Sequence, residues 1–367
     1  MDAKKLGFGL MRLPLTDPND AGSIDMDQLC RMVDTFLERG FTYFDTAWMY
    51  CGGKSECAVK EALTLRHHRE SFTVTSKLPA TPLDSLEKRD EIFFEQLRRT
   101  GLSYFDYYLL HAVGGNNIDK FRQYDCFSWI KEKKAQGLVK NIGFSFHDGP
   151  ALLDQVLTEH PEFDVVQLQI NYLDWKDPKV QSKACYDVVV KHGKKILIME
   201  PVKGGALANV PENVHELFRY REPNMTPASW AIRFAAGLPG VMMVLSGMSN
   251  MEQVLDNTGY MTDFKTLTQD ERRMVLFCGD VIRKNMAIAC TGCAYCMDVC
   301  PMHIGIPQFF KLYNRAMSGT DVREEYHALL PDFTKASECI VCGACEKVCP
   351  QHLSVRKYLR QVAENFE

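Results

Sequence analysis

Strand-like and helix-like patterns of apolar and polar residues alternate along the chain from residue 5 to about residue 260. Residues 25–40 show the helical pattern, with apolar side chains at helical spacing from Leu29 to Leu37 and with Gly40 as the expected helix end. Between such helices lie short, almost continuously apolar runs, the pattern of parallel strands buried on both faces. Strands are predicted at residues 6–13, 41–47, 71–78, 104–111, 139–147, 163–173, 194–202 and 241–248.

Each predicted strand is followed by a predicted helix, so the chain carries eight β-then-α repeats in about 255 residues. Such a repeat is typical of the α/β class and of a closed (β/α)8 or TIM barrel. A doubly wound open sheet is the alternative, but the glycine-rich motif of that fold does not follow the first strand. The predicted division is a barrel at residues 1–262, a connecting helix at 263–284 and a smaller domain at 285–367.

Composition narrows the classes of function. The net charge of −4 gives no reason to expect nucleic acid or an anionic membrane as a partner, and no apolar run of about 18 residues predicts a membrane span. The first residues lack the apolar core of a signal peptide, so a cytoplasmic protein is expected. The 14 cysteines then indicate metal ligation rather than disulfides. Six scattered cysteines are expected to be ordinary side chains: Cys30, Cys51, Cys57, Cys126, Cys185 and Cys278.

Polar residues stand at the C-terminal ends of three consecutive predicted strands, where the active sites of such barrels lie. Asp45, Lys77 and His111 end these strands, and Tyr50 follows in the loop after Asp45. Lys77 is expected to bring the pKa of Tyr50 down toward working pH, and Asp45 to keep Lys77 charged. His111 would place a substrate carbonyl, and Tyr50 would protonate its oxygen as hydride reaches the carbon.

The stretches FDTAWMYCGGKSE, VTSK and YYLLH resemble the aldo-keto reductase superfamily, which uses an Asp–Tyr–Lys–His tetrad on a (β/α)8 barrel. The resemblance covers nearly the whole barrel. It implies an oxidoreductase with NAD or NADP and with a small carbonyl or alcohol substrate. By position, Ser145 and Gln167 are implied to lie near the nicotinamide carboxamide. The other implied cofactor contacts, near the pyrophosphate and the adenosine, are Gly204, Ser246, Gly247, Gln253 and Asn257.

The sequence departs from that family at several positions. Phe146 stands where the family often has asparagine, and Met199 where an aromatic residue stacks on the nicotinamide. The family's NADP-binding lysine and arginine would fall at Gly247 and Gln253, which weakens the case for NADP because a 2′-phosphate needs a cationic partner. The chain also begins almost at the first strand, without the hairpin that commonly closes the barrel floor. We expect the C-terminal domain or its last helix to cover the floor instead.

Two cysteine rows near the end of the chain, CTGCAYCMDVCP and CIVCGACEKVCP, share the pattern C-x2-C-x2-C-x3-C-P. In this pattern three thiolates bind one iron–sulfur cluster and the fourth binds the other, so the two rows interlock. The predicted ligands of the first cluster are Cys290, Cys293, Cys296 and Cys349, and those of the second are Cys339, Cys342, Cys345 and Cys300. Zinc is the competing interpretation, although its sites are usually built from two C-x2-C pairs.

These rows resemble bacterial two-cluster ferredoxins over about 70 residues, which implies a small α-helical domain with two 4Fe-4S clusters. Clusters pass single electrons whereas a nicotinamide passes hydride, and a flavin between them is kept as an alternative. Three functions remain open. The first is an enzyme whose clusters exchange electrons with the barrel or with an external carrier such as ferredoxin or flavodoxin. The second is an NAD(P)H-dependent carbonyl reductase with structural clusters, and the third is a redox sensor or scaffold, which the complete tetrad disfavours.

Overall fold

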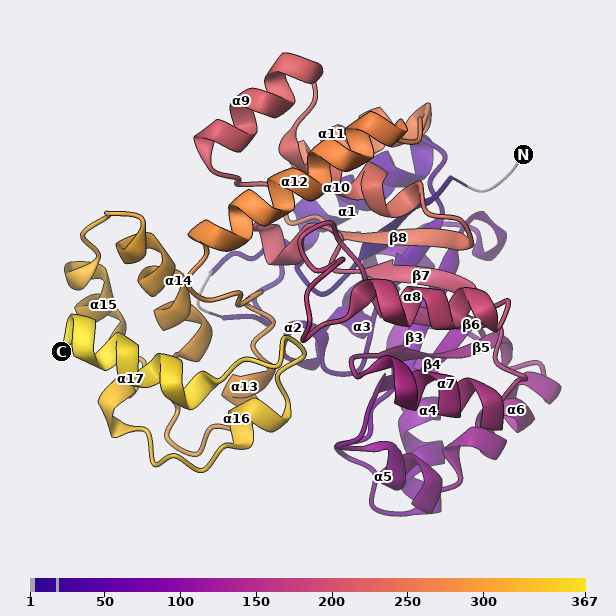
Figure 1. Ribbon diagram of the computed structural model, residues 1–367. Coiled ribbons are helices and arrows are strands. Elements are labelled where there is room, and N and C mark those ends of the chain that lie inside the picture. Colours follow the sequence, from indigo (N-terminus) through magenta and orange to yellow (C-terminus); the bar gives the residue numbers. More distant parts are fainter. Residues whose placement is uncertain (1–3, 18–19) are drawn as a thin grey trace.

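The predicted strands close into one barrel in the computed structural model of the chain, which describes residues 4–17 and 20–367. Neighbouring strands are parallel and follow sequence order, and β1 completes the ring by pairing with β8, where Leu6 lies opposite Val244 (Figure 1). The (β/α)8 prediction is therefore confirmed and the open sheet is excluded. The strands are β1 (Leu6–Gly9), β2 (Tyr43–Asp45), β3 (Thr73–Leu78), β4 (Phe105–Val113), β5 (Val139–Phe146), β6 (Val165–Gln169), β7 (Lys195–Met199) and β8 (Val241–Gly247).

Helices surround the barrel and bury their apolar faces against it. The first helix shows why the sequence pattern predicts its start and its end. Asp25 caps its start by accepting a hydrogen bond from the backbone N–H of Gln28 at 2.9 Å, and Gly40 follows its end with a φ of +79°. The barrel helices are α1 (Met26–Glu38), α2 (Tyr50–Gly53), α3 (Ser55–Val59), α4 (Leu86–Thr100), α5 (Ile118–Gln123), α6 (Cys126–Ala135), α7 (Pro150–Glu159), α8 (Ser182–Lys191), α9 (Glu212–Arg221), α10 (Pro227–Ala236), α11 (Met251–Thr262) and α12 (Gln269–Asn285).

Helix α9 was not predicted, because it is a mostly polar segment that buries only Val214 and Phe218. Short non-α turns at η1 (Lys60–Thr64), η2 (Arg69–Ser71) and η3 (Lys203–Gly205) complete the barrel. In α12, Val275 and Cys278 belong to the barrel core, so the predicted connecting helix packs on the barrel. Within the described part of the chain, no helix combines the length and the apolar character needed to cross a membrane.

A second, separate core follows α12. It is built around Phe309, Phe310, Tyr326 and Leu359, and it joins the helices that carry the cysteine rows to the last helix. The elements of this C-terminal region are α13 (Tyr295–Asp298), α14 (Ile306–Met317), α15 (Arg323–Leu329), η4 (Ala336–Glu338), α16 (Ala344–Lys347) and α17 (Val355–Phe366).

The C-terminal region lies at the end of the barrel where the strands finish (Figure 1). Its His352 ring bonds to the backbone carbonyl of His147, directly after β5, at 3.0 Å. The expectation that this region covers the barrel floor is therefore wrong. At the floor, side chains from the starts of two strands meet inside the barrel, where the Tyr107 hydroxyl lies 3.5 Å from the sulfur of Met242. The polar residues that bind the C-terminal region are at the strand ends, so it closes the mouth of the barrel.

Candidate active site

The four residues predicted as a catalytic set meet at the mouth of the barrel. The Lys77 ammonium donates hydrogen bonds to Asp45 Oδ1 at 2.6 Å and to the Tyr50 hydroxyl at 3.3 Å. It also donates to the carbonyl of Thr46 at 2.8 Å, so all its protons have partners. The His111 ring meets the Tyr50 ring edge to face, with centroids 5.9 Å apart. The phenol of Tyr50 thus contacts the ammonium of Lys77 and the imidazole of His111, and the carboxylate of Asp45 binds the same ammonium.

Burial dominates the electrostatics of this set. Burial raises the pKa of Asp45 and lowers that of Lys77. The ion pair between them opposes both shifts, since it lowers the pKa of Asp45 and raises that of Lys77. The pKa of Tyr50 is raised well above its usual value, first by burial and then by the carboxylates of Asp45 and Glu200. The net shift is therefore opposite to the expected fall toward working pH, because burial outweighs the contact with Lys77. Tyr50 is a protonated phenol at neutral pH, which suits a proton donor.

His111 is held as a neutral imidazole. Burial lowers its pKa well below the usual value, and the nearby Lys77 charge lowers it further. Its Nδ1 atom is buried and has no hydrogen-bond partner among the described residues. A neutral ring beside the Tyr50 hydroxyl can donate a hydrogen bond from its N–H group to a carbonyl oxygen placed between them.

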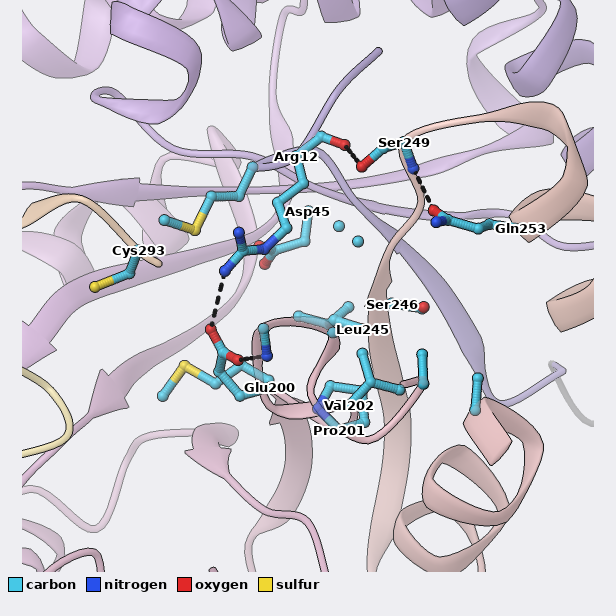
Figure 2. A pocket seen from close by; sticks show the side chains of 18 of the residues that line it. Arg12, Asp45, Glu200, Pro201, Val202, Leu245, Ser246, Ser249, Gln253 and Cys293 are labelled. Atoms are coloured by element: carbon cyan, nitrogen blue, oxygen red, sulfur yellow. Dashed lines mark hydrogen bonds and ion pairs between the residues drawn. The ribbon is translucent and has the colours of Figure 1, made fainter. Parts of the chain in front are cut away.

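A cavity of about 580 Å³ opens from the candidate set toward α11 (Figure 2). This is within the usual size range of sites for cofactors and small molecules. Asp45, Tyr50 and His111 line one end of it, whereas Lys77 lies behind them. All the residues predicted to contact a nicotinamide cofactor also line it: Ser145, Gln167, Gly204, Ser246, Gly247, Gln253 and Asn257.

Several of these predicted cofactor residues already hold neighbouring groups in place. Ser145 Oγ accepts a hydrogen bond from the backbone N–H of Ala112 at 2.7 Å. The Gln167 amide donates to Asp45 Oδ2 at 3.1 Å, which ties β6 to the candidate set. At the other end, the Asn257 amide donates to Ser246 Oγ at 2.7 Å. The cavity wall is thus ordered by its own hydrogen bonds.

The comparisons with known proteins agree with this geometry. A family model described as "Aldo/keto reductase family" matches residues 5–276. The chain belongs to this family. A second model, described as "4Fe-4S dicluster domain", matches residues 289–354. The aldo/keto reductase barrel is therefore followed by an iron–sulfur domain, the name used below for the C-terminal region with α13 to α17.

Curated relatives of this aldo/keto reductase are distant. An aldo-keto reductase of Mycolicibacterium paratuberculosis is 26% identical over 260 residues, 70% of this chain and 80% of that protein. The uncharacterized oxidoreductase YqkF of Bacillus subtilis is 22% identical over 307 residues, 74% of this chain and 91% of that protein. An aldo-keto reductase of Mycolicibacterium smegmatis is 32% identical over 123 residues, so the match spans 41% of that protein.

Solved structures share the fold of the aldo/keto reductase barrel. The holo form of aldo-keto reductase AKR11C1 from Bacillus halodurans is 22% identical, with a TM-score of 0.60, and the match covers 75% of this chain and 91% of that one. An aldo-keto reductase of Klebsiella pneumoniae, solved in complex with NADPH, is 18% identical with a TM-score of 0.58; the match covers 75% and 94% of the two chains.

The charged residues of the reductase cavity that sequence reasoning missed include Arg12 and Glu200 (Figure 2). The Arg12 guanidinium donates to the backbone carbonyl of Thr291 at 2.7 Å and lies 3.8 Å from Glu200. Burial raises the pKa of Glu200, and the Arg12 charge opposes this. The aliphatic part of Arg12 lies beside Gly247. Arg12 directly follows the first strand region, a polar position that the strand-end rule could have found.

The iron–sulfur domain forms one wall of the same cavity. Cys293, Tyr295, Pro350 and Gln351 line it together with the candidate catalytic residues. Gly204, with a φ of +62°, explains how the two domains approach so closely. A Cβ atom at this position would lie 2.2 Å from the carbonyl oxygen of Thr291, so only glycine fits.

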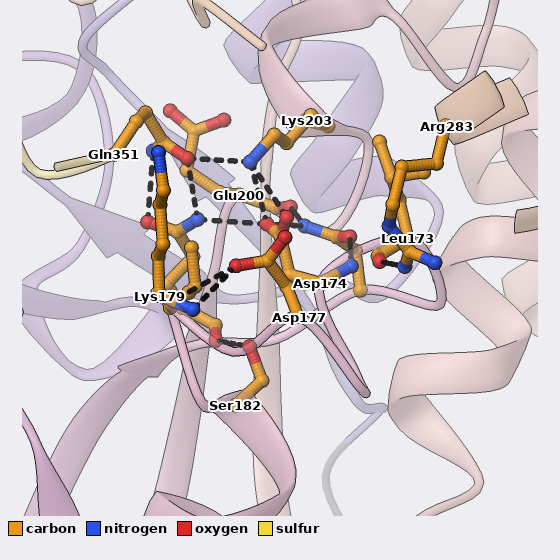
Figure 3. Close-up of polar contacts among 12 residues, drawn as sticks. Leu173, Asp174, Asp177, Lys179, Ser182, Glu200, Lys203, Arg283 and Gln351 are labelled. Atoms are coloured by element: carbon orange, nitrogen blue, oxygen red, sulfur yellow. Dashed lines mark hydrogen bonds and ion pairs between the residues drawn. The ribbon is translucent and has the colours of Figure 1, made fainter. Parts of the chain in front are cut away.

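A buried polar network fastens this wall to the barrel (Figure 3). Gln169, at the end of β6, and Gln351 each donate an amide hydrogen bond to the other at 2.9 Å. The Lys203 ammonium donates to the Gln351 oxygen at 2.5 Å and to Asp174 Oδ1 at 2.6 Å. Lys203 has a φ of +50°, so the loop after β7 is strained where it meets the iron–sulfur domain. Fully satisfied buried networks of this kind fix a unique arrangement.

The structure brings cysteines of the two rows near one another, and their assignment to two clusters stays a prediction. Cys290, Cys293, Cys296 and Cys349 line one small internal cavity. In the other group, the pKa of Cys345 is raised to about 11 by burial, then by Glu346, Cys339 and Cys300, which places these thiols near one another. Cys342 is exposed on the same loop. Among the described residues, no group of three potential ligands converges on one point. The 4Fe-4S dicluster model that matches residues 289–354 supports clusters rather than zinc.

Proposed function

We propose that this aldo/keto reductase interconverts a small carbonyl compound and its alcohol in the barrel cavity, and that its iron–sulfur domain carries electrons between that cavity and an external one-electron carrier. One observation gives the strongest support for electron transfer between the clusters and the cavity. Cys293, a proposed ligand of the first cluster, lines the same cavity as Tyr50 and His111. A cluster held there would border the cavity that contains the proposed reacting groups.

The proposed catalytic roles follow from the geometry of the tetrad. Reduction of a carbonyl adds a hydride at carbon and a proton at oxygen. Tyr50 gives the proton: its O–H bond breaks and a new O–H bond forms on the substrate oxygen. Lys77, which donates to the Tyr50 hydroxyl at 3.3 Å, stabilises the phenolate left behind. The neutral ring of His111 holds the carbonyl oxygen in position, and Asp45 anchors Lys77.

A nicotinamide, when bound, would supply the hydride. The Klebsiella relative was solved with NADPH, and the cavity here is lined by every residue proposed to hold such a cofactor. Gly247 and Gln253 bring no charge for a 2′-phosphate, whereas the Arg12 side chain lies beside Gly247. NAD and NADP therefore both fit the proposal. A flavin finds no support in the comparisons.

The two clusters, when bound, would supply single electrons. The proposed ligands of the first cluster are Cys290, Cys293, Cys296 and Cys349, and those of the second are Cys300, Cys339, Cys342 and Cys345. The second group lies nearer the surface, since Cys342 is exposed and its neighbours Ile340 and Val341 are 58% and 55% exposed. An exposed apolar pair beside a cluster is a suitable contact for a carrier such as ferredoxin or flavodoxin. Electrons would then pass from the carrier through the second cluster and the first to the cavity, where two of them and one proton would return the oxidised nicotinamide to its reduced form for each carbonyl reduced.

The deciding experiment is anaerobic mixing of the cluster-loaded protein with NADH and, separately, with NADPH, while the visible absorbance of the clusters is followed. Bleaching by either nucleotide is expected if the barrel and the clusters share electrons. As a control, Tyr50→Phe should keep the clusters and lose carbonyl turnover. Full turnover in Tyr50→Phe, or clusters that neither nucleotide nor substrate can reduce or oxidise, would contradict the proposal.

A second candidate is an NAD(P)H-dependent carbonyl reductase whose clusters only hold the protein together. The buried contacts of Gln351 with Gln169 and Lys203 favour it, because they give the iron–sulfur domain a structural role whatever its redox chemistry. This function predicts that 4-nitrobenzaldehyde, used as a probe, is reduced at the same rate with oxidised clusters and with dithionite-reduced clusters. The first function predicts different rates.

A further inference from the structure

We propose that Tyr295, a residue of the first cysteine row, is a positioning residue of the barrel active site, where its hydroxyl donates a hydrogen bond to the Tyr50 oxygen. This rests on the proposed function of Tyr50 as the proton donor and extends it. The iron–sulfur domain would then contribute directly to proton chemistry, in addition to any role in electron transfer.

The position of Tyr295 supports this assignment. It lies between Cys293 and Cys296 at the first residue of α13, and it lines the cavity together with Tyr50 and His111. It lies close enough to Tyr50 to lower the pKa of that phenol, against the larger effect of burial. The segment that carries it is fixed nearby, because the Thr291 carbonyl accepts a hydrogen bond from Arg12 at 2.7 Å.

The surroundings of Tyr50 explain why a second donor is useful there. When Tyr50 has given its proton to the substrate oxygen, a phenolate remains in a buried site. Asp45 and Glu200 both oppose a negative charge on Tyr50, and Lys77 is the donor already described. A hydroxyl from Tyr295 stabilises the phenolate without adding charge to the cavity. Tyr295 keeps its own proton throughout, so the step remains one proton moved from Tyr50 to the substrate.

The test compares Tyr295→Phe, which removes only the hydroxyl, with Tyr313→Phe, the same change in the core of the iron–sulfur domain away from the cavity. The rate measured is single-turnover hydride transfer to 4-nitrobenzaldehyde. Tyr295→Phe should slow it by about 10- to 100-fold, the usual effect of removing a hydrogen bond to a charged group. Tyr313→Phe should leave it unchanged, and both variants should keep the visible absorbance of the clusters.

A double-mutant cycle separates a hydrogen bond to Tyr50 from a general disturbance of the site. In a Tyr50→Phe background, adding Tyr295→Phe should not lower the small residual single-turnover rate further, because the oxygen that accepts the bond is gone. If the two losses multiply instead, Tyr295 does not act through Tyr50 and the proposal is overturned. Replacing Tyr295 by 3-fluorotyrosine, a stronger donor, should maintain or raise the rate, and a loss like that of Tyr295→Phe would also overturn it.

A measurement without turnover keeps this proposal distinct from the proposed function. In protein labelled with ¹³C at the tyrosine Cζ atoms, the Tyr50 signal is the one lost in Tyr50→Phe. Tyr295→Phe should shift that signal, and Tyr313→Phe should not. If the signal stays in place and Tyr295→Phe turns over normally, while Tyr50→Phe is inactive, the role of Tyr295 is wrong and the proposed function stands. If Tyr50→Phe is fully active, the proposed function itself fails.

Discussion

Replacing Lys203 by methionine should destabilise the protein far more than replacing a surface lysine in an ion pair of the same length. Lys203 lies 2.6 Å from Asp174, and the two side chains are only 2% and 3% exposed. Lys183 lies 2.6 Å from Asp187, but both of these side chains are 54% exposed. The two pairs thus differ in burial and not in distance, which makes Lys183→Met a matched control.

The magnitude follows from what each substitution leaves behind. Without Lys203, Asp174 remains a buried carboxylate, and breaking one partner out of a buried pair costs about 3–5 kcal/mol. Asp174 would keep amide donors from Gln169 and Asn171, each at 2.8 Å, so we expect the lower end, about 3 kcal/mol. Losing an exposed i,i+4 pair costs below about 1 kcal/mol. Adding Asp174→Asn to Lys203→Met removes the unpaired charge and should recover most of the loss.

The assay is urea unfolding of the anaerobic, cluster-loaded protein, followed by the fluorescence of the buried Trp129 and Trp230. The difference in midpoint, multiplied by the common slope, gives the change in the free energy of unfolding. Equal midpoint shifts in Lys203→Met and Lys183→Met would refute the reasoning from burial. So would a double variant, with Asp174→Asn, that is no more stable than Lys203→Met alone.

Three further predictions test the domain contact, the pH response and the cluster ligands. Gly204→Ala should weaken the docking of the two domains and slow carbonyl turnover, because its Cβ would lie 2.2 Å from a carbonyl oxygen. Gly205→Ala is the control, since it adds only the backbone strain of a positive φ and has nothing within 4 Å of its Cβ. Limited proteolysis between the domains should cleave Gly204→Ala faster than Gly205→Ala. Burial lowers the pKa of His147 from 6.5 to about 4, so the unfolded chain binds this proton first and stability is lost as pH falls from about 6.5 to about 4. His147→Gln should flatten that loss in urea midpoints measured across the range, and an unchanged slope would count against the assignment. Cys349→Ala should remove about half of the iron and spare the other cluster, while Cys278→Ala should leave the iron content unchanged.

The barrel and its tetrad could be predicted because both follow from local patterns. Buried parallel strands are nearly continuous apolar runs, so Asp45, Lys77 and His111 stand out as polar residues at strand ends. In a closed barrel those ends meet on one rim, which turns three separate sequence positions into neighbours. The direction of the Tyr50 pKa shift was not predictable in the same way. The pattern identifies Lys77 as a neighbour, but not the depth of burial, which has the larger effect.

The cavity wall contributed by the iron–sulfur domain could not be predicted, because it depends on how the two domains dock. In the sequence, Tyr295 is one aromatic residue among cysteines, and Gln351 is one amide after a proline. Neither has a periodicity or a spacing that relates it to the barrel. Their places are set by contacts such as that of Gly204 with Thr291, which joins segments with no sequence relation. For the same reason the domain was expected at the barrel floor and is found at the mouth.

A cavity wall contributed by the cysteine rows also bears on how the enzyme matures. The barrel leaves the ribosome first, and Cys293 and Tyr295 follow only with the last part of the chain. Their segment has little secondary structure of its own beyond the short α13, so the clusters themselves would order it. Newly made protein would therefore carry an unfinished catalytic centre until iron and sulfide are inserted. On the proposed function, the cell's iron supply would then set how many copies of the enzyme become active.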